Sequence, residues 1–343
     1  MVRRFLLAAM VLGLSLSAGT PRPAARSSEL PSRLNDRDFW RLVVDSSERD
    51  GYFRSDNLTS NELQYQRVIP DLLRRTRPGA VYLGVGPEQN FTYMTAVRPA
   101  FAVIFDIRRG NLHVQLMYKA LFELARDRVE FVSMLFSKPR PRGVGAESTV
   151  SDLFSAVGSV PRDEGLHVRN LKAIRDQLTR THGLPLVEAD LDGIEYAYRT
   201  FYSRGFAIRY QPTYDDLMVQ TDGEGVSRSY LASEASFAFL KDLESRNLVV
   251  PIVGDFAGPK AIRSIGAYLK AHDATVAAFY LSNVEQYLYS DGKWAAFCRN
   301  VATLPLDSSS TFIRSSSGRG QRFGGGFVSS LGSMAAEASE CGR

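Results

Sequence analysis

Two apolar runs, each ending in residues that suit a nucleotide, are the features that most constrain the fold and the ligand of this chain. Residues 82–88 contain Gly84 and Gly86, and residues 102–106 end in Asp106. About 20 residues separate Gly86 from Asp106, which is the interval expected across one βαβ unit. Glycines let the backbone come close to a ligand, and a carboxylate can accept hydrogen bonds from ribose hydroxyls. The two runs therefore predict a nucleoside-type ligand at the ends of parallel strands.

Further along the chain, strand-like and helix-like segments alternate. Continuous apolar runs at 248–255 and 275–281, with a fifth candidate at 311–314, are typical of strands buried on both faces. Helical spacing of apolar residues appears at 36–47, 59–75, 112–124 and 261–271. This alternation predicts an α/β fold with a doubly wound, mostly parallel, Rossmann-like sheet. Residues 79–137 and 246–314 would form its two halves.

A mostly helical insertion is predicted between these halves, over residues 138–245. It begins at the Pro/Arg-rich run 138–143 and contains helical patterns at 166–181 and 187–203, a possible strand at 206–210 and a helix after Ser233. Six aromatic residues of the insertion could either line a ligand or pack into the core: Tyr196, Tyr198, Phe201, Tyr202, Tyr210 and Tyr214.

The two ends of the chain have their own compositions. Residues 1–25 combine two arginines, a short apolar run and a Pro-containing end, which predicts a signal peptide and an exported, periplasmic or extracellular protein. An uncleaved membrane anchor is the alternative. Residues 26–78 read as a linker and N-terminal helices, where Glu62 suits either a helix N-cap motif or a polar lid. Residues 315–343, rich in Gly and Ser, are predicted to be disordered.

Composition argues against several functional classes. The formal net charge is +5, and the basic residues are scattered among acids without the continuous stripe that tracks a phosphate backbone, so no nucleic-acid partner is expected. Cys298 and Cys341 allow one disulfide but do not require it. The four histidines lie in separate segments without ligand spacing, so no metal site is expected. They are His113, His167, His182 and His272.

The glycines and polar residues at the ends of the predicted strands follow one another in an order and spacing that resemble those of the class I S-adenosylmethionine-dependent methyltransferase fold. The resemblance covers roughly residues 65–135 and 245–315 and implies a cofactor site. It implies cofactor-binding roles for six residues: Gly84, Gly86, Glu88, Asp106, Asp255 and Asn283. The glycine-rich motif at the end of the first predicted strand departs from the family pattern. Tyr82 stands where the family usually has an acid, and Glu88 stands where it has a third glycine. Glu88 could face an ammonium group or could block the cofactor.

A second and more distant resemblance is to the aminocarboxypropyltransferases that build betaine lipids from S-adenosylmethionine. It is carried by residues 106–112, the helix through Lys119 and Glu123, residues 131–136 and residues 281–284. The whole chain also resembles members of a bacterial family of unassigned function, which supplies no catalytic residue.

Each candidate residue also has a purely structural interpretation. A tight strand-to-helix turn uses glycine without any ligand, and Asp106 or Asp255 could cap a following helix. The sequence therefore leaves two functions open. One is an exported S-adenosylmethionine-dependent transferase acting on a small molecule, and the other is a non-catalytic binding or interaction protein that has lost the cofactor.

Overall fold

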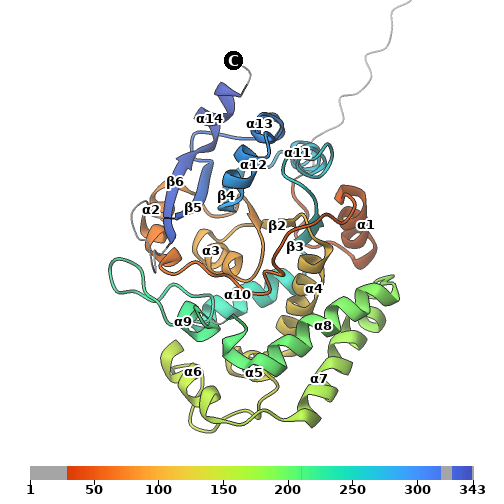
Figure 1. Cartoon of the computed structure of the whole chain (residues 1–343), viewed down its shortest axis with the longest axis vertical. Helices are drawn as coiled ribbons and strands as arrows, with labels where there is room; N and C mark the ends of the chain where they lie inside the picture. Colours follow the sequence, from red (N-terminus) through yellow and green to blue (C-terminus); the bar gives the residue numbers. More distant parts are fainter. Residues whose placement is uncertain (1–28, 210, 318–326, 342–343) are drawn as a thin grey trace, which may run out of the picture.

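The computed structural model describes residues 29–209, 211–317 and 327–341 of the chain (Figure 1). Within these residues lies a six-stranded sheet with the order β3-β2-β1-β4-β5-β6. Its strands are β1 (Val81–Val85), β2 (Phe101–Asp106), β3 (Val249–Val253), β4 (Val276–Ser282), β5 (Thr311–Ser317) and β6 (Phe327–Ser333). Strands β1 to β5 are parallel, and β6 runs antiparallel to β5. The predicted α/β, mostly parallel, Rossmann-like sheet is confirmed.

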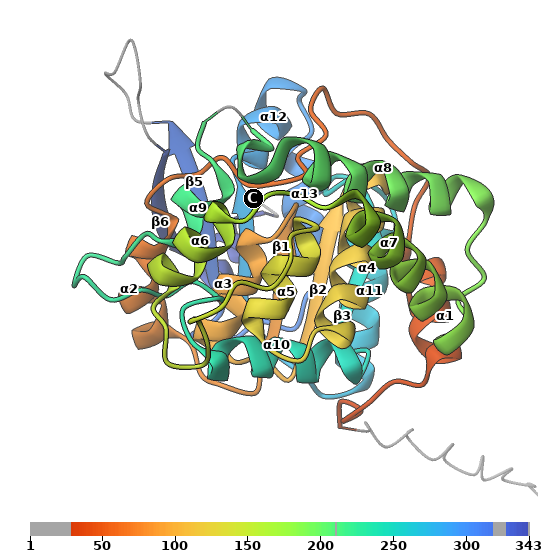
Figure 2. The ribbon, with the colours of Figure 1, turned by 90° about the horizontal axis from the view of Figure 1, so that it is seen from below.

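Helices cover both faces of the sheet, which explains why every residue of β2 is buried. Helices α3 (Gln89–Val97), α4 (Arg109–Leu124) and α10 (Glu234–Ser245) pack on one face, which Figure 2 shows from below. Helices α11 (Ala261–Ala271), α12 (Val284–Ser290) and α13 (Trp294–Val301) lie on the other side of the strands in Figure 1. Helix α1 (Asp36–Ser46) packs along the edge strand β3.

The segment between β2 and β3 is mostly helical, as the sequence predicts. Besides α4 and α10 it contains α5 (Arg128–Leu135), α6 (Val150–Ser159), α7 (Glu164–Asp176), the π-helix η2 (Gln177–Thr181), α8 (Glu188–Arg204), the short 3₁₀-helix η3 (Gly205–Ala207) and α9 (Tyr214–Met218). Aromatic side chains pack the helices of this segment against one another. The rings of Phe122 in α4 and Phe131 in α5, for example, stack with centroids 4.5 Å apart. No strand forms over the described residues 206–209, because Phe206 is drawn from η3 onto Phe136.

The helix predicted over 59–75 begins later than its apolar pattern indicates. The structure has the 3₁₀-helix η1 (Tyr65–Val68) followed by α2 (Ile69–Arg75), and Gln64 before them has a left-handed backbone with φ 67°. Residues 59–64 are not helical because their polar groups bind elsewhere. The backbone N–H of Ser60 donates to the Glu88 carboxylate, and Glu62 is buried against β4. The N-cap interpretation of this segment is wrong.

The prediction of disorder over 315–343 is also wrong for the described part of that segment. Strand β6 pairs with β5 along its length, and α14 (Met334–Glu340) follows it. The open edge of β5 offers unpaired backbone groups that β6 satisfies despite its Ser and Gly content. A disulfide between Cys298 and Cys341 then ties α14 to α13.

The predicted signal segment, residues 1–25, lies outside the described residues. Among the residues that are described, no helix is both long and apolar enough to cross a bilayer.

Candidate functional site

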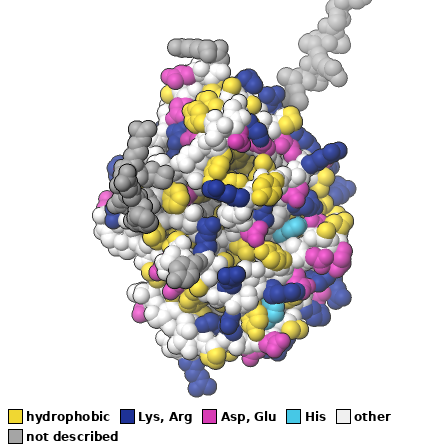
Figure 3. Space-filling model, in the orientation of Figure 1, with side chains coloured by type: hydrophobic (Ala, Val, Ile, Leu, Met, Phe, Trp, Pro, Cys, Tyr) yellow, Lys and Arg dark blue, Asp and Glu magenta, His cyan; other side chains and the backbone are white. Residues whose placement is uncertain are grey.

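A cavity of about 360 Å³ lies at the carboxyl ends of the first four strands. The strand order reverses between β1 and β4, and in an open α/β sheet this is where ligands bind. Figure 3 shows a recess on this face, beside α12. The lining comes from the ends of all four strands, from an N-terminal segment, from α12 and the turn after it, and from Arg209 of the insertion. It includes Val85, Gly86, Asp106, Ile107, Gly254, Asp255, Phe256, Tyr280, Ser282, Asn283 and Tyr287.

Residues 52–62, here called the strap, cross the open side of this cavity. Arg108, just after β2, holds the strap by donating from Nη1 to the Ser55 carbonyl at 2.7 Å and from Nη2 to Asp56 Oδ1 at 2.9 Å. Tyr196 in α8 donates to Asp56 Oδ2 at 2.6 Å. The strap thus connects the sheet with the insertion. The position of the strap over the cavity agrees better with the polar-lid interpretation of this segment than with the helix N-cap interpretation.

The turn after β1 is fixed by side chains. Asn90 Nδ2 donates to the carbonyls of Val85 and Pro87 at 2.9 and 2.7 Å, and Gln115 donates to the Gly86 carbonyl at 3.0 Å. A Cβ on Gly84 would lie 1.8 Å from Asn90 Oδ1, so this glycine is required for packing and does not line the cavity. Gly86 does line the cavity, and its φ of +80° favours glycine.

Glu88 lies behind the turn and outside the cavity. It is fully buried, and its carboxylate oxygens accept the Ser60 N–H at 3.1 and 3.2 Å. Burial raises the pKa of Glu88 to about 7, although the Ser60 hydrogen bond opposes the shift. Glu88 therefore holds the strap against the β1 turn and does not face a ligand directly.

The other acid predicted from the first two runs, Asp106, lies in the cavity wall. Its Oδ1 accepts the Arg108 N–H at 2.9 Å, and no donor among the described residues is bonded to Oδ2. Burial raises the pKa of Asp106 to about 6, opposed by Arg108. The free oxygen of Asp106 gives the cavity an acceptor suited to a ligand hydroxyl.

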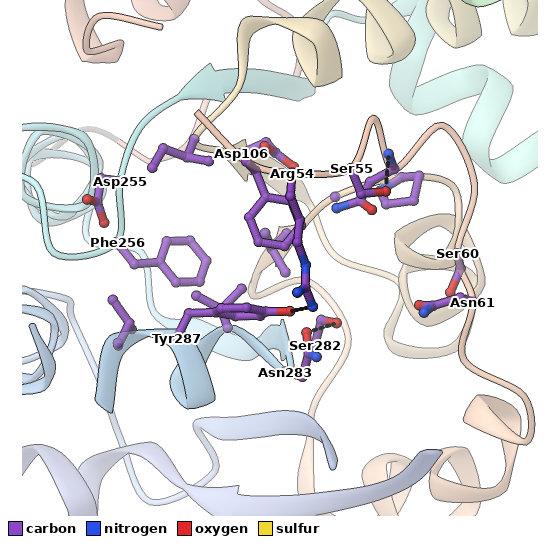
Figure 4. A pocket seen from close by; sticks show the side chains of 18 of the residues that line it. Arg54, Ser55, Ser60, Asn61, Asp106, Asp255, Phe256, Ser282, Asn283 and Tyr287 are labelled. Atoms are coloured by element: carbon purple, nitrogen blue, oxygen red, sulfur yellow. Dashed lines mark hydrogen bonds between the residues drawn. The ribbon is translucent and has the colours of Figure 1, made fainter. Parts of the chain in front are cut away.

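Asp255, at the end of β3, is more fully engaged. Its Oδ1 accepts the Ala257 N–H at 2.9 Å, and its Oδ2 pairs with Lys293 Nζ at 2.9 Å. Figure 4 places Asp255 and Phe256 on one side of the cavity and Ser60 and Asn61 on the other. Asp255 therefore lines the cavity and fixes the turn at Ala257, but it does not cap α11, whose first N–H groups donate to Glu48.

Glu62 is the acid that sequence reasoning missed. It is 1 % exposed and lines the cavity, where it accepts a hydrogen bond from Ser282 Oγ and another from Gln89 Nε2 at 2.9 Å. Burial raises the pKa of Glu62, and these hydrogen bonds oppose the shift. Asn283, predicted as a site residue, lies beside Ser282 in the same wall. The only sequence signal for Glu62 was the polar-lid alternative.

The remaining chemically interesting groups lie elsewhere. Tyr198, Phe201 and Tyr214 are buried in the core, Tyr196 and Tyr202 lie at its outer side, and none of these five lines the cavity; Tyr210 is outside the described residues. Lys119 and Glu123, part of the second resemblance, pair with each other at 2.8 Å in α4, away from the cavity. No cluster of metal-ligating side chains occurs within residues 29–209, 211–317 and 327–341.

Comparison with known proteins gives a family but no activity. No curated protein matches the chain. One family model matches residues 58–143 and 184–331, about two thirds of the sequence. The gap between the two ranges contains α6, α7 and η2, and α1 and α14 also lie outside the match. The matched residues include Glu62, all of β1 to β4 and most of the cavity wall. The chain belongs to the family described as a domain of unknown function, DUF7790.

Proposed function

We propose that this protein binds a nucleoside-type ligand in the cavity beneath the strap, with S-adenosylmethionine as the leading candidate. The observation that carries the proposal is the position of Asp106. Its carboxylate, with Oδ2 free of protein donors in the described structure, lies at the end of β2 next to the point where strand order reverses. A ribose placed there would donate its hydroxyls to Asp106.

The rest of the lining fits the parts of S-adenosylmethionine. Ile107 and Phe256 supply apolar surface on the Asp106 side, as an adenine ring requires, and Gly86 allows a close approach of the backbone. The buried Glu62 carboxylate would take the role that the resemblance implies for Glu88, facing the α-ammonium group. The cavity volume of about 360 Å³ lies within the range of about 300–1,000 Å³ for small-molecule sites.

When bound, S-adenosylmethionine supplies an electrophilic carbon next to its sulfonium centre. Transfer from such a centre depends mainly on alignment, so the chain needs to hold the ligand and the acceptor more than it needs an acid–base triad. The strap would exclude water above the ligand, and Asp106 and Glu62 would fix its orientation.

The proposal includes export. The disulfide between Cys298 and Cys341 supports it, because structural disulfides persist mainly in oxidising compartments. Cell fractionation with mass spectrometry of the N-terminus tests it. A protein recovered in the cytoplasm with Met1 retained would contradict export and would favour an active transferase.

Hydrogen exchange tests the pocket, and product analysis separates the two functions. Adding S-adenosylhomocysteine should slow amide exchange at residues 52–62 and 84–88 and leave α7 unchanged. Unaltered exchange in the strap at millimolar ligand would contradict the proposal. In the presence of acceptors from the source cell envelope, release of S-adenosylhomocysteine would indicate methyl transfer, and release of 5′-methylthioadenosine would indicate aminocarboxypropyl transfer. Binding without turnover would indicate the non-catalytic alternative.

A further inference from the structure

Two arginines in the cavity wall lack the carboxylate partners that neighbouring arginines have. Arg108 pairs with Asp56 at 2.9 Å, and Arg314 pairs with Glu285 at 2.6 Å. Among the described residues, which include every Asp and Glu of the chain, no carboxylate oxygen lies within 4.0 Å of Arg54 or Arg209. Both of these arginines line the cavity.

Arg209 is the more strongly desolvated of the two. It lies after η3 in the insertion and is partly buried, and among the described residues its one side-chain hydrogen bond runs from Nη2 to Ser55 Oγ at 3.4 Å. The charge of Glu88 acts on Arg209, but the Glu88 carboxylate is already bonded to the Ser60 N–H. A guanidinium has five N–H donors, so most of those on Arg209 remain for a ligand.

Arg54 is positioned by aromatic side chains. Its Nη2 donates to the Tyr287 hydroxyl at 3.2 Å, and its guanidinium carbon lies 5.8 Å from the centre of that ring. Phe53 packs edge-on against Tyr287 with centroids 5.2 Å apart. Figure 4 shows Arg54 reaching across the cavity to Tyr287. These contacts hold Arg54 in place without neutralising its charge.

Acidic and basic side chains both line the cavity, and the strap carries Glu62 as well as Arg54. Asp106 stands at the end of the sheet, whereas Arg54 lies on the strap and Arg209 on the insertion. Arg54 is exposed, but Arg209 is partly buried, and removing a cation from water without a counter-charge is unfavourable unless a ligand supplies that charge. We propose that Arg209, assisted by Arg54, forms an anion subsite that binds a carboxylate or phosphate group of the small molecule held in this cavity. The inference rests on the proposed function for the nucleoside part of that molecule and adds the charge of its other end.

Ligand pairs that differ only in the anionic group test this subsite. Affinities of the full mature protein for S-adenosylmethionine and its decarboxylated form, and for AMP and adenosine, are measured by calorimetry. If the subsite binds a carboxylate, decarboxylation should weaken binding by about 10- to 100-fold. If it binds a phosphate, AMP should bind more tightly than adenosine by the same factor. In Arg209→Gln, the affinities of the two ligands that wild type distinguishes should differ by less than about threefold. Arg209→Lys keeps the charge but loses the planar fork, so it should restore only part of the difference.

The control variant is Arg204→Gln, which changes the net charge equally but lies exposed at the end of α8 and outside the cavity lining. It should behave as wild type. Equal affinities for both members of each pair in wild type would overturn the subsite while leaving the proposed function intact, as would full discrimination in Arg209→Gln. If none of these four ligands binds, the proposed nucleoside-binding function is contradicted. Inorganic phosphate then tests the subsite alone: loss of its thermal stabilisation in Arg209→Gln, but not in Arg204→Gln, supports the subsite, and no difference overturns it.

Discussion

Glu62 and Ser282 lie 220 positions apart in the sequence, yet the Ser282 hydroxyl donates a hydrogen bond to the Glu62 carboxylate inside the cavity. This contact joins the end of the strap to the end of β4. It places a buried acid where the ends of β1 and β4 diverge, which no local pattern around Glu62 indicates. The site therefore consists of strand ends, which the sequence pattern reveals, and a strap, which only the tertiary structure reveals.

Asp106→Ala should weaken binding of adenosine-containing ligands by about 1.5–3 kcal/mol, because it removes a charged acceptor of hydroxyl hydrogen bonds. Folding should survive, and Asp45→Ala on the exposed surface of α1 serves as the control. Because burial raises the pKa of Asp106 to about 6, wild-type affinity should also fall as the pH drops below that value. Titration calorimetry at several pH values checks both effects, and an unchanged affinity in folded Asp106→Ala would make Asp106 a purely structural cap.

Glu88→Gln should change how stability depends on pH. The pKa of buried Glu88 is about 7 against an ordinary value near 4.5, so the folded state keeps a proton that the unfolded state loses. The stability from this group is complete below pH 4.5 and is lost as the pH rises through about 7. The shift corresponds to about 3 kcal/mol. Between pH 4 and pH 8, the free energy of unfolding of the variant should therefore rise by up to that amount relative to that of wild type.

Urea unfolding of both proteins across this pH range measures the difference directly. Any constant cost of burying the amide cancels when the two pH values are compared. A difference in unfolding free energy that does not vary with pH would show that Glu88 titrates normally.

Gly84→Ala should destabilise the fold by about 1–3 kcal/mol, the usual cost of overpacking a core. The new Cβ would lie 1.8 Å from Asn90 Oδ1, and Asn90 holds the turn after β1. Gly145→Ala is a suitable control, because a Cβ there meets nothing within 4 Å and its backbone is not left-handed. Thermal unfolding of the two variants should separate them clearly; equal melting temperatures would argue against the tight packing of Asn90 on β1.

Removing the disulfide should cost about 2–4 kcal/mol, because it closes a loop between positions 43 residues apart. The double variant Cys298→Ser and Cys341→Ser should show this loss in urea unfolding, and wild type unfolded without reductant should contain no free thiols. Two titratable thiols in the protein isolated from its native compartment would contradict both the bridge and the export that it supports.

Strands β1 to β4 and their order along the chain could be predicted because each is a short, continuous apolar run that is almost entirely buried. Asp106, Asp255 and Asn283 followed from the same runs, since the carboxyl ends of parallel strands meet at one edge of the sheet. The local pattern failed where a long-range partner decides the structure. Glu62 fits a capping motif until Ser282 is placed beside it, and β6 has a disordered composition until β5 offers it an edge.

Calorimetric titration of the purified mature protein with S-adenosylmethionine and S-adenosylhomocysteine tests the central claim most directly. We predict saturable binding at one site per chain, abolished or strongly weakened in Asp106→Ala. The absence of any binding heat at millimolar ligand, in wild-type protein shown to be folded, would contradict a nucleoside site in this cavity.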